Sequence, residues 1–583
     1  MKNKSTFCKA LCYEMAGSFR NTPKAAIPET KHGVATTSKA GIPKTNDDVA
    51  NTTKAGIPET KHSVATTSKA AIPETRHGVA TTSEAGHSPF RKGVRGICEK
   101  RAVAMLFTLL PLIILSWSPY PATVSHRPTV VGDSILPKWV NEVGAKKFPT
   151  NKNVYYTDKY GALNDGKTLN TKAIQSAIDA CAAKGGGIVR FKAGSYVTGS
   201  LFLKKGVHLL IDKGVELLGS QELKDYPEID TRVAGIEMKW PAALINVINQ
   251  ENVSISGEGI VNARGKPFWD LYWNMRKEYE PKGLRWIVDY DAKRPRTILI
   301  SSSSNVTLKG LTLQQAGFWT VQILYSRYIT VDGIVVRNNI DGHGPSTDGV
   351  DIDSSSYVLV QNCDIDCNDD DFCLKAGRDW DGLRVNRPTE YIVIRDCVAR
   401  AGGGLLTIGS ETSGSIRHVL ATNLTGTGTG NGLNIKSATT RGGTVEDIHF
   451  TKITLTNVGN VVQVTMNWNP TYSYSTLPAG YTMETLPPHW KKMLQKVEPA
   501  EKGIPHFRDI YLSNIVAKGA KRMISATGLK ESTLDNFYFN NMQIESNTYG
   551  EISFANSWNF EKVQVKAGDS SRVTVKNSVN IKM

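Results

Sequence analysis

Helical periodicity is strong in one short stretch of the chain, and strand-like runs take over after it. Between residues 171 and 183 apolar side chains recur on one helical face, which predicts a helix with Thr171 as its N-cap. Three glycines at 185–187 end the pattern, and helical periodicity then largely disappears. The apolar face consists of Ala173, Ile174, Ala177, Ile178 and Cys181.

The strand-like runs can be aligned on one another as repeats. The aligned runs start at Val306, Tyr328, Tyr357, Tyr391, Ile416, Val445, Phe507 and Leu534. The differences between successive start positions are 22, 29, 34, 25, 29, 62 and 27. Most of these intervals suit one coil of a solenoid, and the longest implies a large insertion or two coils. The pattern predicts an all-β fold, a right-handed parallel β-helix with an N-terminal capping helix.

The first hundred residues have a different composition. A 15-residue unit starts at Ala25 and recurs from Ala40, Ala55 and Ala70. Each copy is rich in Thr, Ser, Ala and Lys and has no aromatic residue, so it cannot bury enough apolar surface to offset the entropy of ordering. We predict that residues 1–100 are a disordered spacer or tether. The alternative is a downstream start, for example at Met105, which would leave residues 1–104 untranslated.

The segment 101–125 has the pattern of an export signal. Basic residues precede an apolar run of 16 residues, Ala102 to Trp117, and small and proline residues follow it. The run is shorter than the roughly 20 residues of a full membrane span, so it predicts a signal peptide, with an uncleaved membrane anchor as the alternative. The expected location is secreted or periplasmic. Residues 126–152 then form a polar linker, and 153–583 form the β-helix domain.

Charge and cysteine content exclude several classes of function. The chain has a net charge of +16, of which residues 1–125 contribute 17 basic against 8 acidic side chains and the remainder 53 against 46. Such dispersed charge does not predict a nucleic-acid partner. No CxxC pair, histidine cluster of zinc spacing or phosphate loop occurs, so we expect no metal and no cofactor. Cys363 and Cys397 align in successive coils, where a buried ladder is favoured over a disulfide.

Three aspartates carry the candidate chemistry. Asp348 and Asp369 lie 21 residues apart, with the strand-like run Tyr357 to Val360 between them. If this spacing is one coil, the two carboxyl groups are neighbours and Asp370 lies beside them. Clustered carboxylates repel one another, so one can stay protonated while another is ionised, as acid–base hydrolysis requires. An Asp-rich solvated turn or a calcium site would show the same triplet.

In their order, these motifs resemble glycoside hydrolase family 28, the polygalacturonases and rhamnogalacturonases on a pectate-lyase-like solenoid. To the family pattern of Asn-Thr-Asp, Asp-Asp, Gly-His-Gly and Arg-Ile-Lys correspond, in this chain, Ser346-Thr347-Asp348, Asp369-Asp370, Gly402-Gly403-Gly404 and Asn434-Ile435-Lys436. The resemblance covers roughly residues 153 to 582. It implies a monomeric inverting hydrolase of a galacturonate-containing pectic polysaccharide or oligosaccharide. Asp369 would be the general acid, Asp348 with Asp370 would activate water, and Lys436 would pair with the uronate.

Two departures from the family pattern bear on the substrate. Gly403 stands where the family has histidine, and Asn434 stands where it has arginine. Asn434 cannot bind a carboxylate bidentately, so a rhamnogalacturonan or branched pectin is the alternative substrate. Arg378 and Arg441 are candidate substitute cations, unless they are solvated loop residues.

Other classes of function stay open on the sequence. A polysaccharide lyase on the same fold would need calcium and a basic cluster, which the sequence does not show. A non-catalytic carbohydrate-binding β-helix is compatible with the missing histidine and arginine. Two insertions with aromatic residues, one around Trp269 to Trp286 and one at 469–492, would either close one end of a groove or pack for their own stability.

Overall fold

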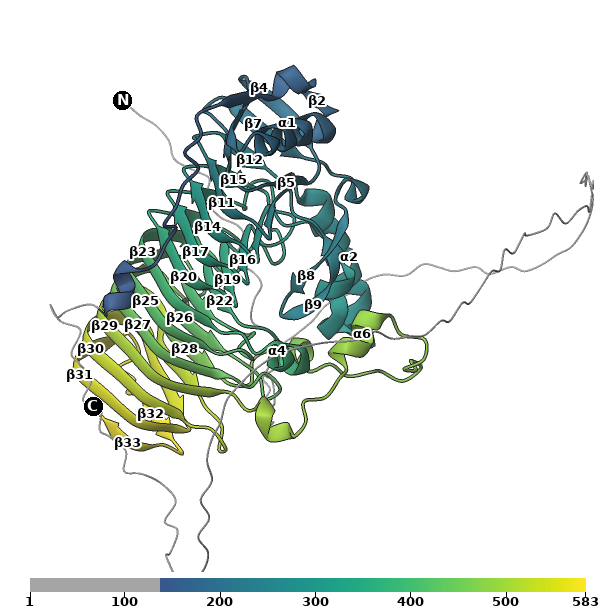
Figure 1. Ribbon diagram of the computed structural model, residues 1–583. Helices are drawn as coiled ribbons and strands as arrows, with labels where there is room; N and C mark the ends of the chain where they lie inside the picture. Colours follow the sequence, from purple (N-terminus) through teal and green to yellow (C-terminus); the bar gives the residue numbers. More distant parts are fainter. Residues whose placement is uncertain (1–136) are drawn as a thin grey trace, which may run out of the picture. The chain divides into compact units, whose positions relative to one another are not determined.

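The computed structural model describes residues 137–583 and consists mainly of parallel strands. Thirty-one strands pair in parallel, and each coil of the chain adds one strand to each of three stacked sheets. Figure 1 shows the strands stacked from β2 and α1 at one end to β32 and β33 at the other. The prediction of an all-β parallel β-helix with an N-terminal helix is confirmed.

The three sheets follow from the strand pairings. The first contains β1 (Val154–Tyr156), β3 (Gly187–Arg190), β6 (Val207–Leu210), β11 (Glu251–Ser256), β14 (Ser304–Lys309), β17 (Arg327–Asp332), β20 (Ser356–Gln361), β23 (Thr389–Ala401), β25 (Ile416–Thr427), β27 (Thr444–Thr456), β29 (His506–Thr527), β30 (Leu534–Ser553), β31 (Ala555–Ala567) and β33 (Val579–Lys582). The second contains β2 (Asp165–Leu169), β4 (Gly194–Thr198), β7 (Val215–Gly219), β12 (Ile260–Asn262), β15 (Thr312–Gln314), β18 (Val335–Arg337) and β21 (Asp364–Asp366), which pairs with the later part of β23. The third contains β5 (Leu201–Leu203), β10 (Ile245–Ile248), β13 (Ile298–Ser301), β16 (Val321–Leu324), β19 (Val350–Asp353), β22 (Phe372–Lys375), β24 (Leu406–Ile408), β26 (Asn431–Lys436), β28 (Asn460–Thr465), the later parts of β29 and β30, and β32 (Thr574–Lys576).

Inward-facing β-branched side chains hold the coils together. Val306 pairs with Ile329, Ile329 with Val358, and Val358 with Ile392, and all four are fully buried. Stacking of like residues in one column buries apolar surface continuously along the solenoid, which stabilises coils that could not fold alone.

The register corrects two of the predicted repeat intervals. Val306 pairs with Ile329 rather than with Tyr328, so that coil is one position longer than predicted. Tyr391 was aligned with Ile416, whereas Ile392 pairs with Val419, so that coil is two positions longer than predicted. Val445 pairs with Phe507 directly, so the longest predicted interval is one coil with a large insertion.

The predicted helix is α1 (Thr171–Ala183), whose buried side chains Ile174, Ala177, Ile178 and Cys181 face the first coils. The N-cap prediction was wrong by one residue: Asn170 is the cap, and Thr171 is the first helical residue. The Thr171 hydroxyl instead accepts a hydrogen bond from the backbone N–H of Gly199 at 2.7 Å. This hydrogen bond ties the first turn of α1 to the residue that follows β4.

Part of the expected linker packs against the outside of the β-helix. The short helix η1 (Lys138–Asn141) places Val140 against Val393 and Leu420, and Trp139 contacts Tyr391 edge-on with ring centroids 5.8 Å apart. The predicted repeats, signal segment and downstream start lie in residues 1–136, outside the described residues. Within residues 137–583 no helix is long and apolar enough to cross a membrane.

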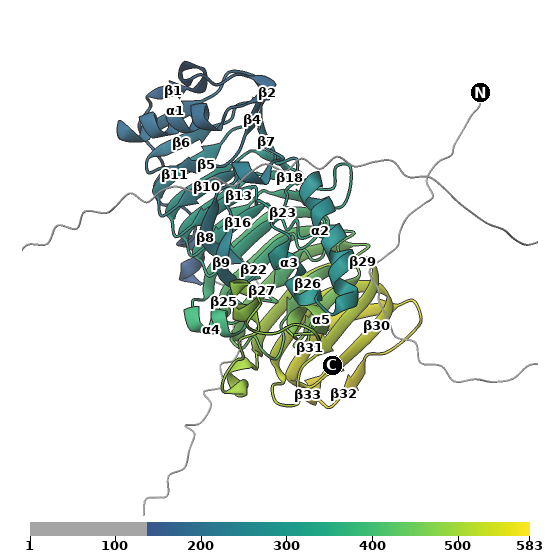
Figure 2. The same cartoon turned by 90° about the vertical axis from the view of Figure 1, so that its right-hand side faces the viewer.

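Three insertions form a second apolar core beside the third sheet. They are the antiparallel hairpin of β8 (Glu228–Val233) and β9 (Ile236–Pro241), the segment around residues 284–290, and the loop between β28 and β29. Trp286 and Trp490, from two of these insertions, meet with ring centroids 5.4 Å apart. Figure 2 shows helices of these insertions in front of the third sheet. Besides α1 and η1, the helical segments of residues 137–583, inside and outside these insertions, are α2 (Lys266–Tyr279), α3 (Val288–Asp291), α4 (Asp379–Val385), α5 (Pro470–Ser473), α6 (Pro488–Met493), η2 (Thr157–Tyr160), η3 (Leu223–Asp225), η4 (Glu280–Lys282), η5 (Arg285–Ile287) and η6 (Ala500–Gly503).

The cysteines of the described region are buried and free. Cys363 and Cys397 lie in successive coils, and the backbone N–H of Cys363 faces the Cys397 sulfur at 3.4 Å. The predicted buried ladder is therefore confirmed.

Candidate active site

The three aspartates lie where two neighbouring strands of the third sheet begin. Val350 of β19 pairs with Phe372 of β22. The same register places Asp348 beside Asp370, and the N–H of Gly349 donates to the Asp370 carbonyl oxygen at 3.0 Å. The predicted coil spacing was therefore one position short, because the direct neighbour of Asp348 is Asp370 and Asp369 precedes it. One carboxylate oxygen from each of the three residues lies within 4.8 Å of the others.

Asp370 is held on both of its carboxylate oxygens. The Lys436 ammonium lies 2.8 Å from Oδ2, and the Thr407 hydroxyl donates to Oδ1 at 2.7 Å. Burial opposes ionisation, but Lys436, Lys375 and these hydrogen bonds prevail and lower the pKa of Asp370 below its usual value. Asp370 is therefore ionised at neutral pH.

Asp369 has the opposite balance. Burial, together with the charges of Asp348 and Asp370, raises the pKa of Asp369 to about 8. Adjacent residues thus present one protonated and one ionised carboxyl group at neutral pH.

A fourth buried acid, Asp351, lies next to Asp348. Burial, followed by repulsion from Asp351, raises the pKa of Asp348 well above its usual value. Burial also raises the pKa of Asp351 to about 7. Within the described region neither carboxyl oxygen of Asp351 has a hydrogen-bond partner, although Lys375 Nζ lies 3.5 Å away.

The buried charges nearly cancel. Lys375 lies 3.5 Å from Asp348 and 3.6 Å from Glu411. The pKa of Glu411 is lowered, because attraction to Lys375 outweighs the cost of burial. Two ionised acids, Asp370 and Glu411, then match the two ammonium groups of Lys436 and Lys375.

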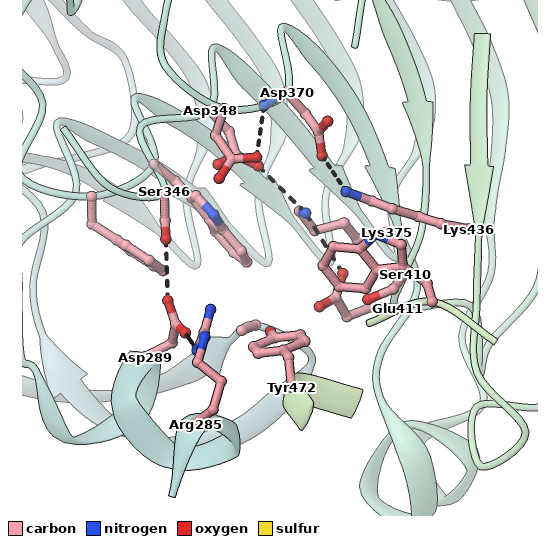
Figure 3. A pocket seen from close by; sticks show the side chains of 15 residues that line it. Arg285, Asp289, Ser346, Asp348, Asp370, Lys375, Ser410, Glu411, Lys436 and Tyr472 are labelled. Carbon is pink, nitrogen blue, oxygen red and sulfur yellow. Dashed lines mark hydrogen bonds and ion pairs between the residues drawn. The ribbon is translucent and has the colours of Figure 1, made fainter. Parts of the chain in front are cut away.

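One pocket, shown in Figure 3, has a cavity volume of about 80 Å³ and is lined by the titratable groups Asp348, Asp369, Asp370, Lys375, Glu411 and Lys436. One wall is the start of the third-sheet strands, and the opposite wall comes from the insertions. The pocket also contains aromatic side chains, whose apolar faces can pack against a sugar ring. They are Phe318, Trp319, Trp468 and Tyr472.

Of the predicted substrate-binding residues and substitute cations, only one lies in the pocket lining. Lys436 lines the pocket. Asn434 is buried below the pocket and its amide lies 3.5 Å from the Thr407 hydroxyl. Arg378 is fully buried outside the pocket lining, where it donates to Asp379, to the Tyr290 hydroxyl and to backbone carbonyls of the insertion. Arg441 is also fully buried and pairs with Asp379.

Among the pocket residues that sequence reasoning missed are Arg285, Trp468 and Tyr472. All three come from insertions, which have no repeat register to locate them. The aromatic composition of both insertions was the available signal. Trp286 and Trp490, by contrast, serve the apolar core of the insertions rather than the pocket.

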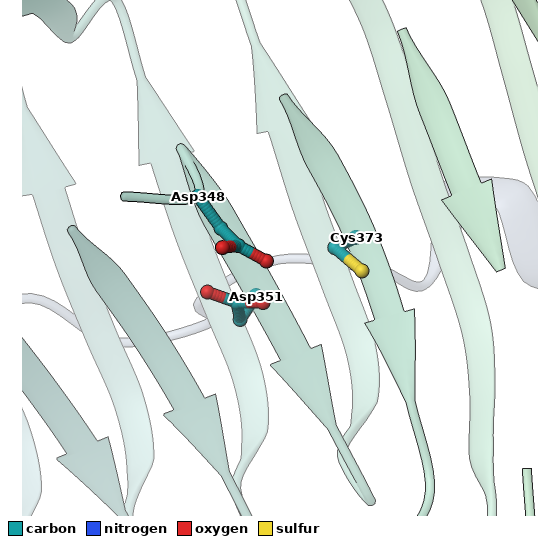
Figure 4. A group of neighbouring side chains, drawn as sticks. All are labelled: Asp348, Asp351 and Cys373. Carbon is teal, nitrogen blue, oxygen red and sulfur yellow. The ribbon is translucent and has the colours of Figure 1, made fainter. Parts of the chain in front are cut away.

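Two acidic groups have the spacing of metal ligands, Asp348 with Asp369 and Asp370, and Asp348 with Asp351 and Cys373 (Figure 4). The lysine ammonium groups already neutralise the first, and burial raises the pKa of the Cys373 thiol, which disfavours the thiolate that binds metals. The donor sets therefore do not favour a cation.

The fold and the pocket define a parallel β-helix protein whose site can exchange protons with a bound molecule. A sequence model described as "Glycosyl hydrolases family 28" matches residues 189–483, half of the chain. The chain belongs to glycosyl hydrolases family 28, as the motifs predict.

Relatives and solved structures agree with this membership. A Vitis vinifera protein described as "Probable polygalacturonase" is 30% identical over 307 residues, which cover 51% of this chain and 59% of the relative. The Dickeya chrysanthemi "Exo-poly-alpha-D-galacturonosidase" is 26% identical over 466 residues, 71% of this chain and 74% of that protein. The chain thus spans less than two thirds of the Vitis relative's length.

The fold matches that of solved family structures. The Yersinia enterocolitica family 28 exopolygalacturonase superposes with a TM-score of 0.61 and 23% identity, over 74% of this chain and 78% of that one. A hyperthermoactive exopolygalacturonase from Thermotoga maritima gives 0.58 and 22%, over 75% and 96%. At these identities the likeness concerns the fold.

Proposed function

We propose that the protein is a secreted inverting hydrolase of galacturonate-containing pectic polysaccharide or oligosaccharide. The observation that carries the proposal is that Asp348, Asp369 and Asp370 meet in one pocket, where Lys436 and Thr407 bind the carboxylate of Asp370. A glycosidic bond breaks when an acid protonates the leaving oxygen and a base activates water. Asp369, with a pKa of about 8, holds the proton, and Asp370 is the ionised base.

Asp348 completes the proposed base. It lies beside Asp370 in the register, and both face the pocket. Loss of a proton from Asp348 to bulk water before the anionic sugar binds would leave two carboxylates to orient one water molecule.

Two observations bear on the stereochemical course. Carboxyl oxygens within 4.8 Å are closer than the roughly 6.5–9.5 Å common in inverting glycosidases, so the spacing alone favours a covalent intermediate. However, Lys436 and Thr407 occupy both oxygens of Asp370, which makes it a poor nucleophile and favours water activation. The family resemblance also implies inversion.

The substrate follows from the relatives and the pocket. The relatives are described as a probable polygalacturonase and an exo-poly-alpha-D-galacturonosidase, and cationic and aromatic side chains in the pocket suit an acidic sugar. A rhamnogalacturonan backbone is the alternative, because the family arginine is absent at Asn434. Export rests on residues 101–125 and is proposed from their sequence alone.

Product analysis tests the proposal. The purified protein is incubated separately with homogalacturonan and rhamnogalacturonan oligosaccharides, and products are followed by mass spectrometry and NMR. We expect saturated products with inverted anomeric configuration and a rate that declines above about pH 8, as Asp369 loses its proton. Asp369→Asn should lower the rate by about 10²–10⁴-fold.

The control is Asp396→Asn on the outer face of β23, a half-exposed carboxylate outside the pocket lining, which should retain activity. Unsaturated products would indicate a lyase. Binding of either oligosaccharide without any product would indicate a carbohydrate-binding protein.

A further inference from the structure

Arg285 lies in the pocket wall opposite the aspartates. It belongs to η5, in the insertion between β12 and β13, and lines the same pocket as Asp348 and Asp370. Figure 3 shows Arg285 and Asp289 on one side of the pocket and the aspartates and lysines on the other. A ligand between the two walls would contact both.

The cations of the pocket differ in how fully they are paired. Lys436 is bound to Asp370 at 2.8 Å, and Lys375 lies within 3.6 Å of three carboxylates. In residues 137–583 Arg285 has one hydrogen-bonding partner, Asp289, to which Nη1 donates at 2.7 Å. Its Nε and Nη2 groups have no protein acceptor in the same region.

Asp289 does not neutralise Arg285 alone. Its other oxygen lies 3.4 Å from the Arg294 guanidinium and accepts from the Ser346 hydroxyl at 3.1 Å. Arg294 is fully buried and stacks on Tyr272 and Phe318. Two guanidinium groups share one carboxylate, so this wall carries a net positive charge.

Packing fixes the orientation of the Arg285 guanidinium. Its central carbon lies 5.0 Å from the ring centroid of Tyr472, another pocket residue, and only 12% of the side chain is exposed. A rigid, partly desolvated guanidinium with free N–H groups is suited to bind a carboxylate through two hydrogen bonds.

We propose that Arg285 binds the free carboxylate of a uronic acid residue in this pocket, and thereby supplies from an insertion the cation that the β-helix lacks at Asn434. The inference rests on the proposed function. It gives the pocket a preference for an unesterified uronate over its methyl ester, which has no charge to pair with Arg285.

The test compares free and methyl-esterified oligogalacturonides. Affinity is measured by calorimetry in the Asp369→Asn background, where the ligand stays intact, and kcat/KM is measured in the otherwise unchanged enzyme. Arg285→Gln should weaken binding of the free acid by about 10- to 100-fold and leave binding of the ester within about threefold. Arg285→Lys keeps the charge but not the paired N–H groups, and should fall between them.

The matched control is Arg276→Gln, on α2 of the same insertion, whose partner is the exposed Glu280. It should bind both ligands normally. Equal losses for acid and ester, or no loss for the acid, would overturn the role of Arg285. If thermal unfolding shows that Arg285→Gln is not folded, the ratio of the affinities for free acid and ester in Arg285→Lys decides instead. Absence of hydrolysis in the unchanged enzyme would reject the proposed function. That result differs from equal binding of free acid and ester, which would reject only the role of Arg285.

Discussion

The Thr407 hydroxyl donates a hydrogen bond to Oδ1 of Asp370 at 2.7 Å. Thr407 lies on β24, one coil beyond Asp370, and Asn434 pairs with it from β26. Gly403, at the family's histidine position, is on the same side of Asp370: a Cβ atom there would lie 3.0 Å from Oδ1. Thr407 therefore provides, within this chain, a hydrogen bond to the proposed base where the family histidine is missing.

Replacing Thr407 by valine should show what this hydrogen bond contributes. Thr407→Val keeps the shape but removes the donor, so the pKa of Asp370 should rise and its ionised form should become scarcer. A hydrogen bond to a charged group contributes about 1.5–3 kcal/mol, so kcat/KM should fall at least about 10-fold. The acidic limb of the pH–rate profile should move to higher pH. Thr427→Val, at the exposed end of β25, should leave both quantities unchanged.

Lys436 should matter for stability as well as for activity. Its side chain is 8% exposed and pairs with an Asp370 side chain that is 3% exposed. Lys436→Met would leave a buried carboxylate without its counter-ion, which costs about 3–5 kcal/mol in unfolding free energy. Urea denaturation at pH 7 measures this. Lys282→Met, which breaks an exposed pair with Glu278 of similar length, 2.7 Å, should cost less than about 1 kcal/mol.

The buried acids predict that stability falls as the pH rises. The pKa values of Asp351 and Asp369 are raised to about 7 and about 8, whereas an unfolded Asp titrates near pH 4. Between the unfolded and the folded pKa, folding takes up a proton at each of these two aspartates. The stabilisation from Asp351 and Asp369 is therefore complete below about pH 4 and is lost as the pH rises through the pKa of each residue in the folded protein. The slope is about 1.4 kcal/mol per pH unit for each proton taken up.

Asp351→Asn tests this dependence. Asp351 is fully buried without a hydrogen-bond partner in the described region, so a neutral amide removes the proton uptake and should flatten the decline in stability between pH 5 and 8. It should also lower the pKa of Asp348, because repulsion from Asp351 disappears. An unchanged slope in urea denaturation at pH 5, 6, 7 and 8 would contradict the assignment.

The fold was predictable because its columns repeat visibly. Tyr328, Tyr357 and Tyr391 were aligned with one another from the sequence, and their rings stack at 5.0 and 4.8 Å. The column of Val306 was misaligned by one residue, because the three tyrosines are partly exposed positions of positive φ within β17, β20 and β23, whereas Val306 points inward. Apolarity alone does not distinguish these two positions.

The candidate site was predictable only where it belongs to the coils. A spacing close to one coil located Asp348 near Asp370, and the strand motif located Lys436. Arg285 and Tyr472 could not be placed, because residues distant in sequence meet there through the apolar core of the insertions, which has no period. Arg378 resembled a free loop cation, but its burial and its four hydrogen bonds cannot be inferred from one sequence.

The close approach of Gly403 to Asp370 leads to a last prediction. The backbone at Gly403 does not have a positive φ, so alanine would be tolerated there but for the carboxylate 3.0 Å from its Cβ. Asp370 cannot retreat without loosening these contacts, because Lys436 holds its Oδ2 and Thr407 holds the same Oδ1 that the added methyl group would meet. Gly403→Ala should displace Oδ1, weaken the Thr407 hydrogen bond and lower kcat/KM about 10-fold, since overpacking by a methyl group costs about 1–3 kcal/mol. Gly568→Ala is the control, because no atom there lies closer than 3.6 Å to the added Cβ. Full activity of Gly403→Ala would mean that Asp370 shifts without loss, and that its contact with Thr407 is not needed for the reaction.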